Sequence, residues 1–284
     1  MLRKRHRFKR VHYNYSIELE KKTIIATHDL SIGYKTKKET IVIAKNLNLE
    51  LTSDKLITLV GANGIGKSTL LRTLTGIQKP LSGDVFFAEK NINSFDTLEL
   101  AQNLSLVLTE KLPPSNLTVF ELIALGRQPY TNWLGKLSDD DLKVVNDVIH
   151  LVQIEHLAEK KHFEISDGQL QKVMIARALA QETSIIILDE PTTHLDLFHK
   201  VSVFKLLKKL SQETNKCILF STHDIDLAIQ LSDEMIVMTE ENIVQDQPCN
   251  LISKGVFNSL FKDETITFDS QKGKFVIRDA NFKT

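Results

Sequence analysis

Residues 56–77 read LITLVGANGIGKSTLLRTLTGI, and this stretch decides the fold. An apolar strand comes first, a glycine-rich segment follows, and a segment of helical periodicity ends the stretch. The glycine-rich part matches the pattern G-x-x-x-x-G-K-[ST], in which backbone N–H groups and the positive end of the following helix bind phosphate. The sequence therefore predicts a phosphate-binding loop between a buried strand and a helix, an arrangement that an accidental glycine turn would not have on both sides.

The residue types of this loop, residues 61–69, indicate a bound nucleoside triphosphate with magnesium. Lys67 is expected to reach the β- and γ-phosphates, and the Ser68 hydroxyl to ligate Mg²⁺. The other positions that we expect to bind ATP are Gly61, Asn63, Gly64, Gly66 and Thr69.

A second apolar run, residues 185–188, ends in two acids that fit the same chemistry. Asp189 is expected to hold Mg²⁺, and Glu190 to orient or deprotonate the attacking water. An acidic pair after a strand is otherwise a helix cap or the start of a loop, but the phosphate loop favours the catalytic interpretation. Together the two segments predict a magnesium-dependent ATPase in which Lys67 and Glu190 are catalytic.

Two further segments have a structural and a functional interpretation. Ser166 and Gln169 have capping-box spacing around Gly168, which fits either a well-capped helix or an anion site. His223 follows the strand CILF and either donates to the γ-phosphate, as a catalytic residue, or is a structural histidine at a strand end.

Composition excludes several other classes of protein. The 284 residues contain 36 basic and 36 acidic side chains, so no charge excess indicates a nucleic-acid partner. Six of the basic residues lie within residues 1–10, and residues 1–20 are predicted to be a disordered basic tail, either solvated or in contact with anionic lipid or RNA. The two cysteines exclude a disulfide framework and fit a reducing compartment. No apolar run approaches the roughly 20 residues of a membrane span, so a membrane role requires other chains.

Short apolar runs alternate with helical periodicity, which predicts an α/β fold with a parallel sheet. The expected buried strands are 56–60, 104–108, 185–188 and 218–220. A helix is predicted over about 138–156, within a mainly helical insertion at about 111–171. Two hairpins are predicted, one joining 235–238 to 243–246 and the other formed around the turn at 270–273.

The ordered set of motifs over about residues 24–280 resembles the ATPase subunits of ABC transporters. The phosphate loop corresponds to Walker A, 165–169 to the signature, 185–190 to Walker B, 193–196 to the D-loop, and His223 to the switch histidine. The resemblance implies a P-loop NTPase (RecA-like) core with an antiparallel β subdomain and a helical insertion, forming one ATPase domain over 21–284.

In that family two copies enclose two ATP molecules between facing half-sites. By resemblance, the chain is a homodimer in which Ser166, Gly168 and Gln169 contact the nucleotide of the partner copy, and Asp196 communicates between copies. The resemblance also implies that Tyr34 stacks on adenine, although an aromatic residue after a glycine is often part of the core.

Residues 116–130 are similar to a narrower group, the ATPases of iron(III)-siderophore, haem and cobalamin importers. That likeness implies a subunit that hydrolyses ATP to drive uptake through a separate transmembrane permease dimer, with an extracytoplasmic binding protein acting indirectly. Its expected location is the cytoplasmic face of the inner (plasma) membrane, as a peripheral subunit. Pro129, Tyr130 and Trp133 would receive the permease, or alternatively form an aromatic cluster that closes the insertion.

The chain departs from the family pattern at two places. Thr109 and Glu110 follow the strand at 104–108, where the family has a glutamine, and Asp167 replaces a glycine of the signature. The main rival is a soluble ABC ATPase that acts in ribosome remodelling or iron–sulfur assembly without transport. An ATP-switched clamp of the chromosome-maintenance type would need a longer coiled coil than the insertion allows. A P-loop kinase would lack the signature and the switch histidine.

Overall fold

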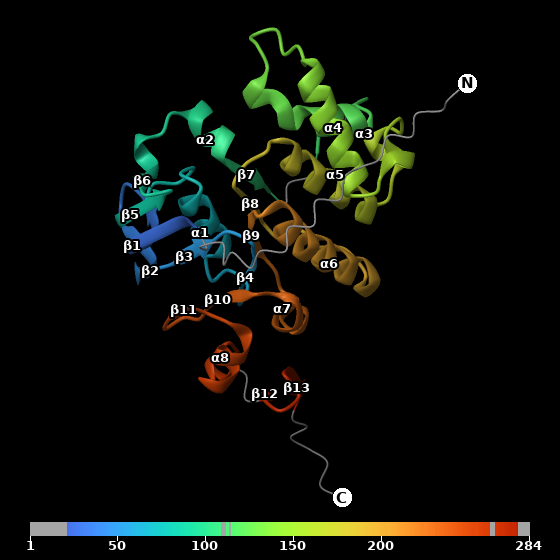
Figure 1. Ribbon diagram of the computed structural model, residues 1–284. Helices are drawn as coiled ribbons and strands as arrows, with labels where there is room; N and C mark the ends of the chain where they lie inside the picture. Colours follow the sequence, from blue (N-terminus) through green and yellow to red (C-terminus); the bar gives the residue numbers. More distant parts are fainter. Residues whose placement is uncertain (1–21, 109–111, 114, 262–264, 278–284) are drawn as a thin grey trace, which may run out of the picture.

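The computed structural model describes residues 22–108, 112–113, 115–261 and 265–277, so the predicted basic tail and Thr109–Glu110 lie outside the described residues. Its central sheet has the strand order β11-β10-β4-β9-β8-β7 (Figure 1). The bounds are β4 (Lys55–Gly61), β7 (Leu104–Val107), β8 (Ile185–Leu188), β9 (Cys217–Ser221), β10 (Glu234–Met238) and β11 (Ile243–Asp246). Strands β10, β4, β9, β8 and β7 are parallel, and only β11 in this sheet runs antiparallel to its neighbour. The predicted parallel sheet is confirmed.

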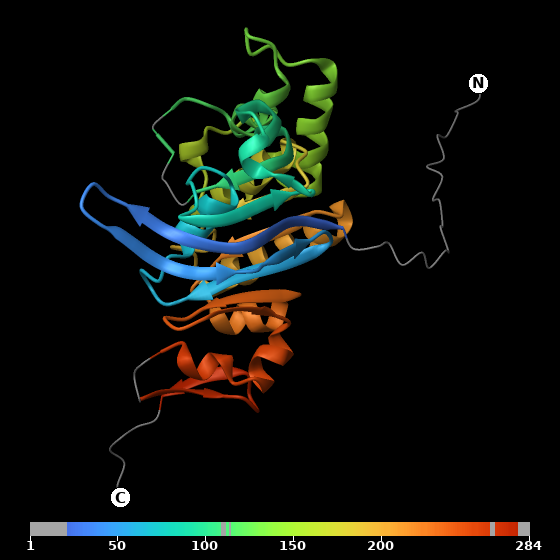
Figure 2. The same cartoon turned by 90° about the vertical axis from the view of Figure 1, so that its left-hand side faces the viewer.

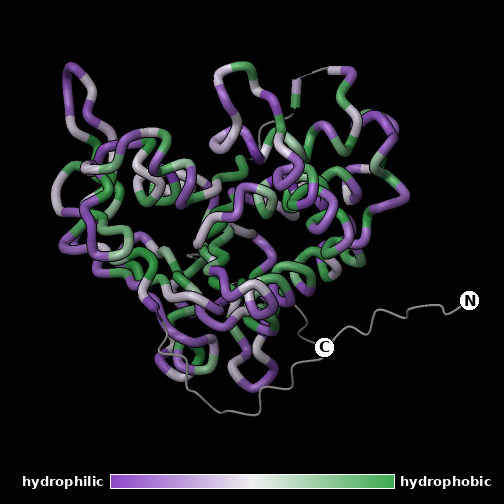
Figure 3. The backbone as a smooth tube through the Cα atoms, turned by 45° about the horizontal axis from the view of Figure 1, so that its top comes forward, coloured by the Kyte–Doolittle hydropathy of each residue, from purple (hydrophilic) through white to green (hydrophobic). Residues whose placement is uncertain are grey.

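Both faces of this sheet are covered, which explains the continuous apolar runs of its strands. In β8, Ile186 and Leu188 pack into one hydrophobic cluster while Ile185 and Ile187 pack into the other. Helices α1 (Lys67–Leu74), α5 (Asp167–Ala180), α6 (Leu197–Thr214) and α7 (Ile225–Leu231) alternate with the strands along the chain. Figure 3 shows the hydrophobic stretches in the interior and the hydrophilic ones along the outer loops.

A second, antiparallel sheet lies beside the first and has the order β2-β1-β5-β6, with β3 paired to β1. Its strands are β1 (Thr23–Lys35), β2 (Thr40–Leu47), β3 (Glu50–Thr52), β5 (Ser82–Phe87) and β6 (Lys90–Asn91). Figure 2 shows β1 and β2 as a long curved hairpin. The short elements η1 (Ile92–Ser94) and α2 (Thr97–Asn103) then lead into β7.

Between β7 and β8 the described residues are mainly helical. The elements are α3 (Val119–Ala124), η2 (Leu125–Tyr130), α4 (Asp139–Leu151), η3 (Glu155–Leu157), η4 (His162–Glu164) and α5. Helix α4 begins at the predicted cap, where Ser138 and Asp141 form a capping box. The prediction that it extends to about residue 156 is wrong, because Val152 is the C-terminal cap and Gln153 takes a left-handed φ of 60°.

The last part of the chain lies at one end of the molecule (Figure 2). It contains α8 (Pro248–Ser253), η5 (Val256–Ser259), β12 (Ile266–Asp269) and β13 (Lys274–Ile277). Both predicted hairpins are confirmed, as β10 with β11 and as β12 with β13. Phe257 of η5 packs its ring against Phe268 and Phe275, which belong to the second hairpin. Cys217 and Cys249 are unpaired, and none of the helices in the described parts is both long and apolar enough for a membrane crossing.

Candidate nucleotide-binding and catalytic site

The loop between β4 and α1 forms an open cradle of backbone groups. Gly66 is the N-terminal cap of α1 with a φ of 110°, and no described side chain caps this helix, so the cap leaves the first-turn N–H groups for another acceptor. A Cβ built on Gly66 would lie 2.4 Å from Ile43 Cγ2, whereas one built on Gly64 would meet nothing within 4 Å. The loop therefore offers N–H groups at a helix N-terminus beside open space, which fits the phosphates of ATP.

Lys67 lies in this cradle and is 5% exposed. Its Nζ donates to the carbonyl oxygens of Gly61 (3.1 Å) and Ala62 (3.3 Å) and lies 3.9 Å from Glu190 Oε1. Burial lowers the pKa of Lys67 below its ordinary value, and the carboxylates of Glu190 and Asp189 oppose that change. An anionic phosphate beside Nζ would compensate the desolvated cation.

A single buried hydroxyl organises the acid pair that follows β8. Ser221, at the end of the neighbouring strand β9, donates from Oγ to Asp189 Oδ1 (2.6 Å) and accepts from the Glu190 backbone N–H (2.8 Å). Glu190 has a left-handed φ of 49°, a conformation that is uncommon for a residue with a side chain and that clusters at functional sites. Ser221 was not predicted from the sequence as a site residue. The only indication in the sequence is its position in the segment STHD, which follows a strand and contains His223.

The carboxylate of Glu190 is held by groups from three segments. His223 Nε2 lies 2.5 Å from Glu190 Oε1, and Thr193 Oγ1 donates to Oε2 at 3.2 Å. Lys67 approaches the same Oε1 from the phosphate loop. The structure thus brings together the three predicted catalytic residues, Lys67, Glu190 and His223, at the edge where parallel strands end. A carboxylate oriented in this way can take a proton from a nearby water.

The predicted magnesium ligands, Ser68 and Asp189, have suitable donor atoms and follow strands of the same sheet. Ser68 follows β4 and Asp189 follows β8, and both strands flank β9, so the two residues come from the same edge of the sheet. A hydroxyl and a carboxylate are the hard oxygen donors that Mg²⁺ takes. The described residues contain no group of three His, Cys, Asp or Glu that could hold a metal alone. This sparse donor set fits an ion that also binds phosphate oxygens and water.

Tyr34 in β1 lies beside the phosphate loop rather than in the core. Its hydroxyl is 2.5 Å from Thr69 Oγ1, and the residue is 44% exposed. The alternative of a core aromatic is therefore wrong. Stacking of its ring on adenine stays a prediction.

The signature residues and Asp196 form a second group at the N-termini of α5 and α6. Ser166 caps α5 by accepting from the Gln169 N–H, and Gln169 Oε1 accepts from the Ser166 N–H. A Cβ built on Gly168 would lie 2.7 Å from His199 Cδ2, and His199 Nδ1 lies 2.8 Å from Asp196 Oδ1. Among the described residues, no side-chain hydrogen bond or ion pair joins this group to the phosphate loop.

A cleft of about 280 Å³ borders the acid pair on the side of β7 and α5. Its lining includes Val107, Asp167, Glu190 and His194. The cleft begins at the C-terminal end of β7. Thr109 and Glu110, which stand where the family has a glutamine, follow in the sequence and lie outside the described residues.

The segment after α3 exposes two of the three predicted docking residues, Tyr130 and Trp133, while Pro129 is half-buried. We call Pro129, Tyr130 and Trp133 the docking surface. Tyr130 is 38% exposed, and Trp133 is 91% exposed next to Leu134, which is 67% exposed. A tryptophan with this exposure does not close an aromatic cluster of the insertion.

Comparison with known proteins gives consistent matches over most of the chain. A family profile described as "ABC transporter" matches residues 44–193. The chain is 37% identical to an uncharacterized ABC transporter ATP-binding protein of Methanocaldococcus jannaschii, over 92% of this chain and 89% of that protein. It is 33% identical to the iron(3+)-hydroxamate import ATP-binding protein of Bacillus subtilis, over 88% of this chain and 92% of that protein.

A solved structure agrees with these sequence matches. The dimeric structure of a bacterial ABC transporter cassette superposes with a TM-score of 0.67 at 29% identity, covering 79% of this chain and 99% of that one. The predicted fold class, a P-loop NTPase core with an antiparallel β subdomain, is confirmed.

Proposed function

This chain belongs to the ABC transporter family, and from that membership we propose that it is the ATPase subunit of an importer that takes up an iron(III)-siderophore through a separate permease. Its similarity to the iron(3+)-hydroxamate import protein, over nearly the full length of both chains, supports this substrate class. Hydrolysis of ATP with Mg²⁺ is the activity of the family. The observation that carries the ATPase assignment is the convergence of Lys67 and His223 on the Glu190 carboxylate beside the phosphate loop.

We assign the following roles to the site residues. Lys67 would bind the γ-phosphate, and Ser68 and Asp189 would hold Mg²⁺, which when bound neutralises charge on the phosphate oxygens. Glu190 would take a proton from the attacking water, with its carboxylate fixed by the Thr193 hydroxyl. Because His223 contacts the same carboxylate, it is placed to donate to the phosphate once ATP occupies the cradle. Tyr34 would stack on adenine.

Glu190→Gln tests the catalytic assignment. Glutamine keeps the shape of the side chain but cannot accept the proton, so we expect ATP turnover to fall by about 10² to 10⁴ while ATP binding is retained. The matched control is Glu159→Gln, since Glu159 is exposed. Turnover in Glu190→Gln as high as in that control would remove Glu190 from its proposed role.

We further propose that the active unit is a homodimer in which each ATP lies between the phosphate loop of one copy and Ser166, Gly168 and Gln169 of the other. The dimeric cassette to which the chain is similar supports this. Asp196, tied to His199 against Gly168, would carry changes between the two sites.

Mixing two inactive variants tests the arrangement. Ser166→Ala and Lys67→Ala each disable both sites of a homodimer, but a mixed dimer keeps one intact pair of half-sites. Random mixing should restore about a quarter of wild-type turnover, because half of the dimers then have one of two sites intact. If the mixture is no more active than its components, the shared site is refuted.

The docking surface is the place where we propose that the permease dimer binds, at the cytoplasmic face of the membrane. An extracytoplasmic binding protein would deliver the siderophore on the other side. The exposure of Tyr130 and Trp133 supports a protein partner at this surface.

A further inference from the structure

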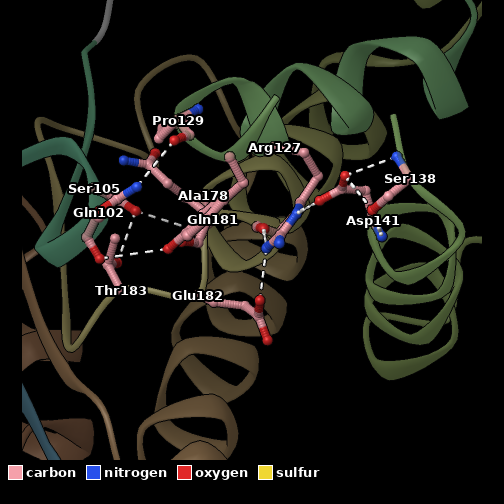
Figure 4. A network of polar contacts seen from close by, with 12 residues as sticks. Gln102, Ser105, Arg127, Pro129, Ser138, Asp141, Ala178, Gln181, Glu182 and Thr183 are labelled. Carbon is pink, nitrogen blue, oxygen red and sulfur yellow. Dashed lines mark hydrogen bonds and ion pairs between the residues drawn. The ribbon is translucent and has the colours of Figure 1, made fainter. Parts of the chain in front are cut away.

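One buried arginine joins three segments behind the docking surface. Arg127 in η2 is 6% exposed. Its Nε donates to Asp141 Oδ1 of α4 at 2.8 Å, and its Nη1 donates to the Ala180 carbonyl at 2.8 Å and to Glu182 Oε2 at 2.6 Å (Figure 4). A single guanidinium thus ties η2 and α4 to the C-terminal end of α5. Glu182 is the exposed member, with its side chain 54% exposed.

The same arginine supports the docking surface directly. The Arg127 guanidinium carbon lies 4.1 Å from the centre of the Tyr130 ring, a cation–π distance, and the Tyr130 hydroxyl donates to the Gln181 carbonyl at 2.9 Å. Gln102 Nε2 donates to the Pro129 carbonyl at 3.0 Å, which fixes the neighbouring residue to α2. The position of Tyr130 is therefore set by contacts with the end of α5 and not by its own loop alone.

The network also reaches the central sheet. Gln181 Nε2 donates to the Ala101 carbonyl (2.5 Å) and to the Leu104 carbonyl (3.1 Å), at the junction of α2 and β7. Ser105 in β7 donates to the Ala178 carbonyl of α5 at 3.1 Å. The C-terminal end of α5 is consequently held from both sides, by η2 and α4 on one and by β7 on the other.

Helix α5 connects this network with the signature residues. The helix has 14 residues, so its capped N-terminus, with Ser166, lies about 21 Å from the Arg127 network. A straight helix of this length moves as a rigid element, and a tilt imposed at one end displaces the other.

We propose that Arg127 is a positioning residue that couples the docking surface to the signature end of α5. This rests on the proposed function, in which Ser166 contacts ATP of the second copy and Tyr130 contacts the permease. The directed hydrogen bonds of the Arg127 guanidinium fix one orientation of the segments that it joins, whereas an apolar side chain of similar volume would hold them without fixing that orientation. Coupling between two sites is reciprocal, so ATP bound at the signature must also change the docking surface in the isolated protein.

The test measures backbone hydrogen exchange of residues 125–137 in the Glu190→Gln protein, with and without ATP and Mg²⁺. We expect ATP to change the exchange rate of this segment by about fivefold, the lower end of typical coupling. Adding Arg127→Gln should abolish this change while leaving ATP binding intact. Arg127→Lys, which keeps the charge but not the two-nitrogen geometry, should restore only part of it. The control Lys136→Gln removes an exposed cation from the same segment and should keep the full response.

The outcomes separate this inference from the proposed function. If Glu190→Gln fails to bind ATP, or binds it and stays monomeric by light scattering, the proposed function fails first, and the exchange experiment is read only on the ATP-bound dimer. If it binds ATP and segment 125–137 does not respond, or responds equally in Arg127→Gln, the coupling role of Arg127 is overturned. Should Arg127→Gln not fold, Glu182→Ala, which removes only the exposed partner, must still reduce the response, and an unchanged response in both Glu182→Ala and Arg127→Lys overturns the inference.

Discussion

Replacing Ser221 by alanine removes the hydroxyl that joins the two acids of the site. The serine is completely buried, so water cannot readily take its place. The substitution leaves the Glu190 N–H without its acceptor, which costs about 1 to 3 kcal/mol, and removes a hydrogen bond to the Asp189 carboxylate worth about 1.5 to 3 kcal/mol. Because both bonds share one oxygen they do not add fully, and we expect the free energy of unfolding to fall by about 2 to 4 kcal/mol.

Urea unfolding at neutral pH measures this change, and ATP turnover measured in parallel should also fall, since the backbone of Glu190 loses its anchor. Ser211→Ala is the matched control. Ser211 is equally buried, but its hydroxyl donates only to the Lys208 carbonyl within α6, where alanine is a better helix former. If Ser221→Ala and Ser211→Ala have the same stability, Ser221 does not organise the acid pair.

Two further predictions concern backbone conformation and pH. Gly66→Ala should abolish ATP binding and lower stability, because the φ of 110° at this position disfavours any side chain and the new Cβ would clash with Ile43. Equilibrium binding of a fluorescent ATP analogue would measure the loss of affinity. Wild-type affinity in this variant would contradict the assignment of the loop as the phosphate cradle. Hydrogen bonds from Ser138, and secondarily from Arg127, lower the pKa of Asp141 to about 2. A carboxyl group with a lowered pKa in the folded state contributes stability above its ordinary pKa, and this contribution is lost as pH falls towards 2. At pH 7 we expect the free energy of unfolding of wild type to exceed that of Asp141→Asn by roughly 2 to 3 kcal/mol. Denaturant titrations should show this difference shrinking between about pH 4 and pH 2. A difference that stays constant over that interval would contradict the assigned pKa.

The central sheet was predictable because its strands are buried on both faces. A run such as Ile185–Leu188 admits few other interpretations when a turn and two acids follow it. The carboxyl ends of parallel strands meet at one edge, so the sequence also predicted that Lys67, Asp189 and Glu190 come together. The individual roles of these residues remain predictions.

The antiparallel sheet could be expected only from the family resemblance. Strand β1 spans Thr23–Lys35 without regular alternation of buried and exposed residues, and its pairing with β2 and β5 shifts register near Leu30 and Ser31. Such irregular strands are defined by their partners, and a pattern search along one segment does not identify them.

Ion pairs between residues that are distant in sequence could not be predicted either. Arg127 pairs with residues 14 and 55 positions away, and nothing local distinguishes it from a solvated arginine. The end of α4 was misplaced for a related reason, since Gln153 adopts the left-handed conformation that a sequence normally signals with glycine.

The mass of the Glu190→Gln protein in solution, measured by light scattering with and without ATP and Mg²⁺, tests most directly whether two chains share the nucleotide. We predict that ATP converts the 32.3 kDa chain into a species of twice that mass, and that adding Lys67→Ala prevents the conversion. A mass that stays at that of one chain, in the presence of demonstrably bound ATP, would contradict the account.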